Sequence, residues 1–365
     1  MENYLPNTNL IKAEIPKGKK TFSSIALKAK NTTSTIEGVK KHLTDSLAGK
    51  HKVLRTRYTS LNRMLLGGFH FGQLVLLAGA SGHGKSYLLN TLIRDFMDQR
   101  LNNPDFKFII LHFGFEMSSE VEFMRRISAN TKIPFRKLMS SDDPLNKEDY
   151  KLIESYCNAI GEEPILYFEN PGTRLQIEAT IKNVAASDKY KDHKIVVTMD
   201  HSLLVLNEKG ENEIETLAEL GKMFIQLKKE YGLLGIILGQ LNDKIEGERR
   251  RDPTNPAMHY PTKTDIHGSK QLYHASDVVL VVHQPALLNL EYYGKNNIPT
   301  KHLIALHALK QRNGQQGFIL MYNFLKYGMF VQRPKDKDIR QEIFDAISNE
   351  DLQRVLLLEK QALIK

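Results

Sequence analysis

Residues 79–86 read GASGHGKS, directly after the apolar run QLVLLA, and match the spacing G-x-x-x-x-G-K-[ST]. Glycines at these positions let the backbone fold so that successive N–H groups face phosphate oxygens. In this pattern Lys85 would neutralise the β- and γ-phosphates, the Ser86 hydroxyl would bind Mg²⁺, and His83 would be only a spacer. We expect ATP or another nucleoside triphosphate here, with Mg²⁺; the alternative is a glycine-rich turn without a ligand. The predicted contacts are Gly79, Ala80, Ser81, Gly82, His83, Gly84, Lys85, Ser86 and Tyr87.

Three polar residues close other apolar runs. Glu116 ends FIILHFGFE, where a carboxylate could act as the general base that polarises the attacking water. Asp200 ends KIVVTMD and could hold Mg²⁺, while Gln240 ends LGIILGQ and could sense the γ-phosphate and relay its presence to the following loop. Each could instead be an ordinary helix cap or strand-end residue. Ser119 and Glu122 have the spacing of a capping box, so Glu116 is not needed as a cap.

A pair of cations precedes a predicted tight turn in the run LKQRNGQQG. Lys310 and Arg312 are two apart on an apolar strand and therefore share one face, while Gln311 faces away. The dipeptide at 313–314, Asn-Gly, is a strong hairpin signal. Two cations at a hairpin tip could reach the γ-phosphate held by another subunit. Taken alone, these residues favour the alternative, an ordinary solvated basic hairpin.

The elements that must position these residues alternate along the chain. Near-continuous apolar strands separated by helices predict an α/β fold with a mostly parallel sheet and helices on both faces. The last hairpin predicts antiparallel strands at the C-terminal end of the sheet. The expected strands lie at 74–78, 107–113, 164–168, 194–199, 234–239, 278–283 and 303–309, and the helices at 85–99, 118–130, 147–160, 174–186 and 213–230.

We divide the chain into four parts. Residues 1–32 form a flexible basic arm, 33–50 an amphipathic linker helix, 51–335 the main domain and 336–365 a charged helical tail. The tail could cover the domain or bind a partner. The linker helix must bury its apolar stripe on its own domain or on a neighbouring subunit. That stripe consists of Ile36, Val39, Leu43 and Leu47.

Composition narrows the classes of function. Among 365 residues the net charge is +9, which favours a polyanionic partner such as nucleic acid, although a surplus of charge for solubility is the alternative. A single cysteine, Cys157, excludes an intrachain disulfide and fits a reducing compartment. We find no zinc-ligand spacing, signal peptide or membrane-spanning apolar run, so we expect a cytoplasmic protein without a membrane partner.

These motifs together resemble the motor domain of replicative DNA helicases of the DnaB type, a RecA-like P-loop ATPase, over residues 51–333. The resemblance rests on FGQLVLLAGASGHGKS, HFGFEMSSEVEFMRRISAN, KIVVTMDHSLLVL, GIILGQLND and LKQRNGQQG, with His201 where that family usually has tyrosine. It implies a ring of six subunits that encircles single-stranded DNA and translocates on nucleotide hydrolysis. It also implies that Lys310 and Arg312 act in trans on the neighbour's γ-phosphate, and that Tyr327 stacks on adenine.

Two stretches are expected to contact DNA. DIHGSKQLYHASD, at 265–277, resembles the DNA-contacting loop of the family, with His267 in place of the usual arginine. An uncharged His267 weakens a phosphate contact, and Lys270 could compensate. The preceding loop, 243–264, is long, basic and broken by proline, so it could face the channel of a ring or be a solvated disordered excursion. The predicted DNA contacts are Arg249, Arg250, Arg251, His267, Gly268 and Lys270.

The resemblance has limits. Before residue 51 we expect no room for the helical collar of cellular DnaB or for a fused primase, and the compact chain suggests a helicase of a phage or mobile element in a bacterial cytoplasm. A primase or a helicase loader would then be a separate partner. Two other classes stay open: a RecA-type recombinase filament, and a non-catalytic helicase relative that serves as a loader or regulator.

Overall fold

The computed structural model describes residues 29–48, 53–267 and 270–364. The chain divides into two compact units, Met1–His51 and Lys52–Lys365, which we treat separately. In the described residues no helix is long and apolar enough to cross a membrane.

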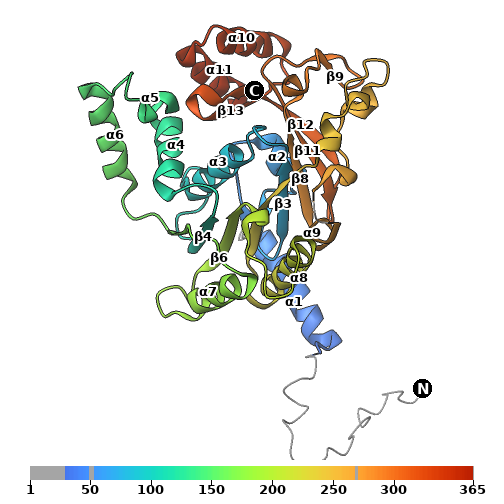
Figure 1. The fold of residues 1–365 in the computed structure, drawn as a ribbon. Helices are drawn as coiled ribbons and strands as arrows, with labels where there is room; N and C mark the ends of the chain where they lie inside the picture. The colour runs from blue at the N-terminus through green and yellow to red at the C-terminus, as the bar shows by residue number, and fades with distance from the viewer. Residues whose placement is uncertain (1–28, 49–52, 268–269, 365) are drawn as a thin grey trace, which may run out of the picture. The chain divides into compact units, whose positions relative to one another are not determined.

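A nine-stranded sheet forms the centre of the larger unit, with the order β13-β12-β11-β8-β3-β7-β6-β4-β5 (Figure 1). The six strands from β8 to β5 run parallel to one another, whereas β11, β12 and β13 join the sheet through antiparallel pairs. The predicted fold class is therefore confirmed. The strands are β3 (Leu74–Gly79), β4 (Phe108–Gly114), β5 (Ile165–Phe168), β6 (Lys194–Asp200), β7 (Leu234–Gln240), β8 (Val278–His283), β11 (Leu303–Gln311), β12 (Gly317–Phe324) and β13 (Met329–Gln332).

Helices cover both faces of this sheet because each buried strand alternates its side chains between two cores. Val75 and Leu77 of β3 pack in one core with the apolar face of α3 (Lys85–Met97). Leu74, Leu76 and Ala78 pack in the other with α7 (Arg174–Ala186), α8 (Glu213–Tyr231) and α9 (Lys270–Ala275). This fixes β3 in the middle of the sheet, between the two cores, so the loop that follows it has a rigid base.

Further helices and strands complete the domain. They are β1 (Val53–Leu54), α2 (Thr59–Met64), β2 (Phe69–His70), α4 (Ser119–Thr131), α5 (Phe135–Met139), α6 (Lys147–Ile160), β9 (Tyr292–Tyr293) and β10 (Ile298–Pro299). The C-terminal helices α10 (Lys337–Ser348) and α11 (Leu352–Ile364) lie beside β13 (Figure 1). They form a third apolar cluster with residues of β12 and β13. The tail thus covers the domain, the first of the two roles considered for it.

The smaller unit contains α1 (Thr32–Leu47), which begins one residue before the range predicted for the linker helix, 33–50, and ends three residues before its end. Asn31 caps it by accepting a hydrogen bond from the Ser34 N–H at 2.8 Å. The apolar stripe is exposed, from 49% at Ile36 to 91% at Leu47. A helix of this length with an unburied stripe is marginal in water by itself.

Candidate functional site: a phosphate loop at the centre of the sheet

The glycine-rich loop joins β3 to α3, as the spacing predicts. Gly82 and Gly84 have φ values of 75° and 92°, in the left-handed region that glycine adopts without strain. A Cβ atom at Gly84 would lie 2.8 Å from the ring of Phe330, so a larger residue would also clash. The first turn of α3 therefore presents its free N–H groups beside the loop, where an anion is favoured.

A cavity of about 190 Å³ opens beside this loop. Side chains from the ends of three parallel strands meet there, because the carboxyl ends of parallel strands share one edge of a sheet. Predicted residues make up most of the lining, together with four others, Met117, Arg125, His201 and Leu325. The predicted residues are Ser81, Gly82, Gly84, Lys85, Ser86, Tyr87, Glu116 and Gln240.

Lys85 points back over the loop, and its Nζ donates to the Ala80 carbonyl at 2.9 Å. Burial lowers the pKa of Lys85, and the carboxylates of Asp200 and Glu116 partly offset this effect. The Lys85 ammonium group is therefore partly shielded from water and close to two carboxylates. Its attraction for a bound phosphate is stronger in such surroundings than in bulk water.

Asp200, at the end of β6, is buried and hydrogen-bonded to the Ser86 side chain. Burial raises the pKa of Asp200 to about 6. Its Oδ1 atom is buried and finds no hydrogen-bond partner among the described residues. A carboxylate and a hydroxyl oxygen side by side suit Mg²⁺, which commonly takes few protein ligands and fills its other positions with water and phosphate oxygens. The described residues contain no group of three or more His, Cys, Asp or Glu that could hold a metal by themselves.

Glu116 follows β4 and is half-exposed, with Oε2 lying 3.9 Å from Nε2 of His201. Burial lowers the pKa of His201, although Glu116 opposes that shift. The predicted capping box beside it is wrong. Ser118 is the N-cap residue of α4, and Glu122 binds Nε2 of the buried His112 at 2.6 Å instead.

His83 is more than a spacer, in contrast to the prediction. It is 2% exposed, and its Nδ1 accepts the Gln284 N–H at 3.1 Å. Its ring lies 5.7 Å from that of His283, the last residue of β8. Burial and the charge of Lys85 lower the pKa of His83 to about 4, so the ring is neutral near pH 7. The variable part of the loop is thereby attached to the end of β8, a contact that spacing could not reveal.

Gln240 ends β7 directly beside Gly79 of β3. Its carbonyl accepts the His267 N–H at 2.8 Å. A main-chain hydrogen bond therefore joins the end of β7, at the phosphate-loop cavity, directly to the predicted DNA-contacting loop.

Tyr327 does not line this cavity. Leu325, at the start of the same 3-10 turn, lines it instead. Tyr327 packs edge-on against Phe324, with ring centroids 4.9 Å apart, and joins the cluster under the C-terminal helices. Also in the cavity lining, Arg125 stacks over Tyr87, with Cζ 4.8 Å from the ring centroid, an arrangement that the sequence did not indicate.

The two cations of the hairpin share one face, as expected, but they lie far from the cavity of their own chain. Lys310 pairs with Val279, and the Arg312 N–H donates to the Asp277 carbonyl at the start of β8. The Asp277 N–H in turn donates to the Leu74 carbonyl at the start of β3. From there to Gly79 the strand runs about 16 Å. Neither cation lines the cavity beside the phosphate loop of its own chain.

The predicted DNA contacts divide into two kinds. Arg249 and Arg251 are exposed. Arg250 is buried, contacts both carboxylate oxygens of Asp265, and donates to the carbonyls of Met258 and Tyr260. The expectation that Arg250 contacts DNA is therefore wrong, because its donors are used to fold the loop. Ordered 3-10 turns, rather than a disordered excursion, fill this loop.

The remaining predicted contacts lie around the start of α9. His267 is exposed, with Nε2 3.4 Å from Oε1 of Glu213. Gly268 lies outside the described residues. Lys270 is the first residue of α9, and the described part of the structure does not include its side chain.

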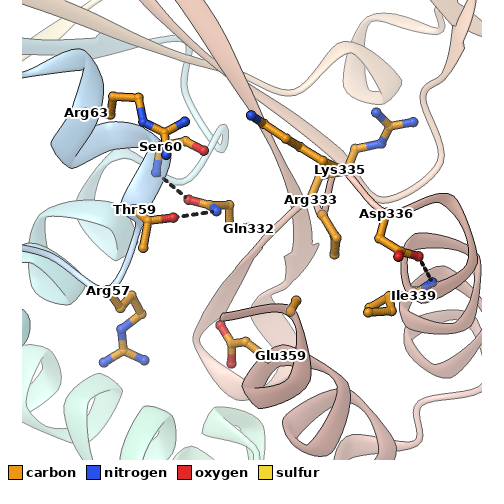
Figure 2. A pocket seen from close by; sticks show the side chains of 12 residues that line it. Arg57, Thr59, Ser60, Arg63, Gln332, Arg333, Lys335, Asp336, Ile339 and Glu359 are labelled. Carbon is orange, nitrogen blue, oxygen red and sulfur yellow. Dashed lines mark hydrogen bonds between the residues drawn. The ribbon is translucent and has the colours of Figure 1, made fainter. Parts of the chain in front are cut away.

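A larger cavity of about 640 Å³ lies elsewhere, between α2, the β13–α10 connection and α11 (Figure 2). The Gln332 side chain points toward α2 on one side of it, accepting the Ser60 N–H at 3.0 Å and donating to the Thr59 hydroxyl at 3.1 Å (Figure 2). Arg57 on its wall is bound to buried Asp95. None of the predicted site residues lines this cavity, and we regard it as the seam where the C-terminal helices join the domain.

The fold and the site define a RecA-like phosphate-loop domain, with its ligand cavity at the carboxyl edge of a parallel sheet. Residues 53–332 match the family described as DnaB-like helicase C terminal domain, and the chain belongs to that family.

Curated relatives include the replicative DNA helicases DnaB of Geobacillus stearothermophilus and of Mycoplasma pneumoniae. The first is 23% identical over 289 residues, which cover 78% of this chain and 58% of the relative. The second is 26% identical over 273 residues, which cover 73% and 54%. The chain thus spans little more than half the length of these relatives.

Two solved structures share the fold. One is an ATPase domain with a TM-score of 0.69 and 17% identity, covering 84% of this chain and 99% of that one. The other is a DnaB-like replicative helicase, studied with its interactions with primase, with a TM-score of 0.64 and 18% identity, covering 77% and 63%.

Proposed function

We propose that this chain is the ATP-driven motor of a replicative DNA helicase, which translocates on single-stranded DNA and unwinds duplex. The observation that carries the proposal is the convergence of Lys85, Ser86 and Glu116 on one cavity beside buried Asp200. A phosphate-binding turn alone would not need a buried acid with a free oxygen beside the serine and a second, accessible acid.

Each residue then has a distinct role. The loop N–H groups and Lys85 bind and neutralise the β- and γ-phosphates, while Ser86 and Asp200 hold Mg²⁺, which supplies charge neutralisation on the phosphate oxygens. Glu116, the accessible acid, orients and polarises the attacking water. Gln240 detects the γ-phosphate and passes the change to residue 267 through its main-chain hydrogen bond.

The site requires a second subunit under this proposal. Lys310 and Arg312 lie too far from their own loop, and they would neutralise the γ-phosphate that a neighbour holds. The exposed stripe of α1 would bury itself on the next subunit, since an apolar face of this size favours a partner. A closed ring of six copies fits this head-to-tail use of two different surfaces.

Single-stranded DNA would lie along a basic track. The exposed Arg249 and Arg251 supply cations, together with Lys270 and, when protonated, His267. The net charge of +9 supports a polyanionic partner. We also place the protein in a bacterial cytoplasm, as the product of a phage or mobile element, with a separate primase or loader as a partner.

Unwinding of forked DNA tests this function. Forks with only a 5′ or only a 3′ tail should be opened from one of the two, with ATP and Mg²⁺ but not without them. Lys85→Ala is the matched control and should abolish both hydrolysis and unwinding. DNA-stimulated hydrolysis that survives in Lys85→Ala would refute the assignment. Electron microscopy on the same forks separates the classes, because an open helical filament would favour a recombinase and a closed ring the motor.

A further inference from the structure

The two hairpin cations are held by a specific set of groups within their own subunit. The Lys310 Nζ donates to the carbonyls of Tyr273 at 2.8 Å and His274 at 3.0 Å, and it lies 5.1 Å from the centre of the Tyr273 ring. The Nη2 of Arg312 donates to the same His274 carbonyl at 3.0 Å. These carbonyls belong to the last turn of α9, where carbonyl groups lack helical partners and attract cations.

Asp277 is a further contact of Arg312 within the same chain. Its Oδ1 lies 3.3 Å from Nη1 of Arg312, while its Oδ2 accepts the Leu74 N–H and binds the Nζ of Lys228. Asp277 and Lys228 are both buried. The buried cation and the main-chain donor both bind one oxygen of the Asp277 carboxylate and so fix its orientation. The other oxygen is thereby directed at the guanidinium of Arg312.

Arg312 nevertheless remains accessible. Its side chain is 50% exposed, and the contacts above occupy two of its five N–H donors. Lys310 likewise keeps one of its three donors. The contacts therefore restrict where the cations point without using them up, which distinguishes this arrangement from the buried Arg250.

We propose that Asp277 and the C-terminal carbonyls of α9 are a positioning set, which aims Arg312 and Lys310 at the nucleotide of the neighbouring subunit. This inference rests on the proposed function, because it assumes that the cations act in trans. Asp277 touches no nucleotide and acts only through Arg312. The prediction is directional: Asp277 matters in the subunit that donates the cations and not in the subunit that holds the phosphates.

Mixed assemblies test that direction. Lys85→Ala subunits have intact cations, and Arg312→Ala subunits have an intact phosphate loop, so mixing them should restore some DNA-stimulated hydrolysis at composite sites. Native mass spectrometry verifies that the two kinds of subunit co-assemble. Absence of any restored hydrolysis in co-assembled rings would overturn the trans role, and with it the proposed function and this inference.

Given that rescue, Asp277→Asn is added to one partner at a time. In the Lys85→Ala subunit it should lower the restored rate about tenfold, because a misaimed guanidinium stabilises the transition state less. In the Arg312→Ala subunit it should leave the restored rate within about twofold, since that subunit no longer donates a guanidinium. Asp192→Asn, an exposed aspartate in a turn, is the matched control in both positions. Equal loss in both positions, or no loss in either, would overturn the positioning role while leaving the proposed function intact.

Tyr273→Leu provides a second variant if Asp277→Asn melts at a lower temperature. Tyr273 is half-buried, and the substitution removes the ring beneath Lys310 but keeps the carbonyl. We expect a loss of about threefold in the cation-donating subunit only. A symmetric effect would again contradict the proposal.

Discussion

At the scale of single residues, two acids near one phosphate loop have opposite environments. Asp200 is buried, with its pKa raised to about 6, whereas Glu116 is half-exposed. Burial next to Ser86 suits a ligand that is neutralised by a bound cation, and exposure suits a group that must meet water. Both acids follow apolar runs in the sequence, so only their environments separate the two roles.

His83 yields a residue-scale prediction. His83→Leu removes the acceptor for the part-buried Gln284 N–H, and an unpaired donor costs up to about 1–3 kcal/mol where it is buried. We expect nucleotide affinity to fall about tenfold, because the loop loses its attachment to the end of β8. Titration with a fluorescent ATP analogue measures the affinity.

His83→Asn is the matched control, since its side-chain oxygen can accept the same N–H. It should keep most of the affinity. Wild-type affinity in His83→Leu would show that the contact does not support the loop.

At the scale of elements, a local ion pair decides which arginines of a basic loop are free. Three consecutive arginines are equivalent in sequence, yet the middle one folds the 3-10 turns of residues 243–265 through Asp265. Likewise, the Asn-Gly signal gives the β11–β12 hairpin, whereas the carbonyls of α9 determine where its cations lie.

The arginine triplet gives an element-scale prediction. Arg249→Gln combined with Arg251→Gln should lower single-stranded DNA affinity several-fold, reduce its dependence on salt and leave the melting temperature unchanged. Arg250→Gln should lower the melting temperature by several degrees, because it leaves Asp265 buried without its cation. Fluorescence anisotropy at several salt concentrations and thermal melting make the two measurements. Similar DNA-binding losses in both variants, without a change in melting, would contradict the division.

Lys132, at the end of α4, predicts a pH dependence of stability. Its Nζ donates to the Ala129 carbonyl, and burial lowers its pKa from 10.5 to about 7. Between pH 7 and pH 10.5 Lys132 is therefore neutral in the folded state but still protonated in the unfolded state. Burial of its charge lowers the stability of the folded state in full below pH 7, and this loss of stability disappears as the pH rises to 10.5. Lys132→Met should raise the melting temperature by roughly 3–5 °C at pH 7.

This gain should shrink steadily as the pH rises toward 10.5. Exposed Lys147, at the start of α6, offers the control Lys147→Met, which should show no such trend. A gain for Lys132→Met that is independent of pH would mean that packing, rather than charge, causes it.

At the scale of the whole molecule, the features of the larger unit and of α1 both require further copies under the proposed function. Among the described cations, Lys85 and Arg125 line the phosphate-loop cavity while Lys310 and Arg312 do not, and α1 exposes its apolar stripe. Each feature is costly or incomplete in one chain, and a neighbouring copy would satisfy both.

Removal of residues 1–50 tests the role of α1. We expect the truncated protein to form smaller assemblies in native mass spectrometry, while its melting temperature stays close to that of the full chain. The double substitution Val39→Ser and Leu43→Ser should have a similar effect, and Lys41→Ser on the same helix should not. Unchanged assemblies in both the truncated and the double-substituted protein would show that α1 does not connect subunits.

The sequence by itself determined the sheet, its helices and the phosphate loop. Apolar runs predicted seven of the nine strands of the large sheet within two residues at either end, because buried parallel strands are near-continuous apolar runs. The hairpin signal predicted antiparallel strands after them but gave no bounds for β12 or β13. The glycine spacing gave the loop, because few other residues allow φ values such as those of Gly82 and Gly84. These features depend on the types and spacing of residues that are close together in the chain, and the sequence shows these directly.

Only the tertiary structure decided which polar groups meet. The pairing of Glu122 with His112, the burial of Arg250, the attachment of His83 and the exclusion of Tyr327 from the cavity all join or separate residues that lie on different elements. Such contacts depend on how elements pack in space, and residue spacing carries no information about that. The same reason explains Asp277, a residue to which the sequence assigned no role, whose partners come from α8, β3 and the end of the β11 hairpin.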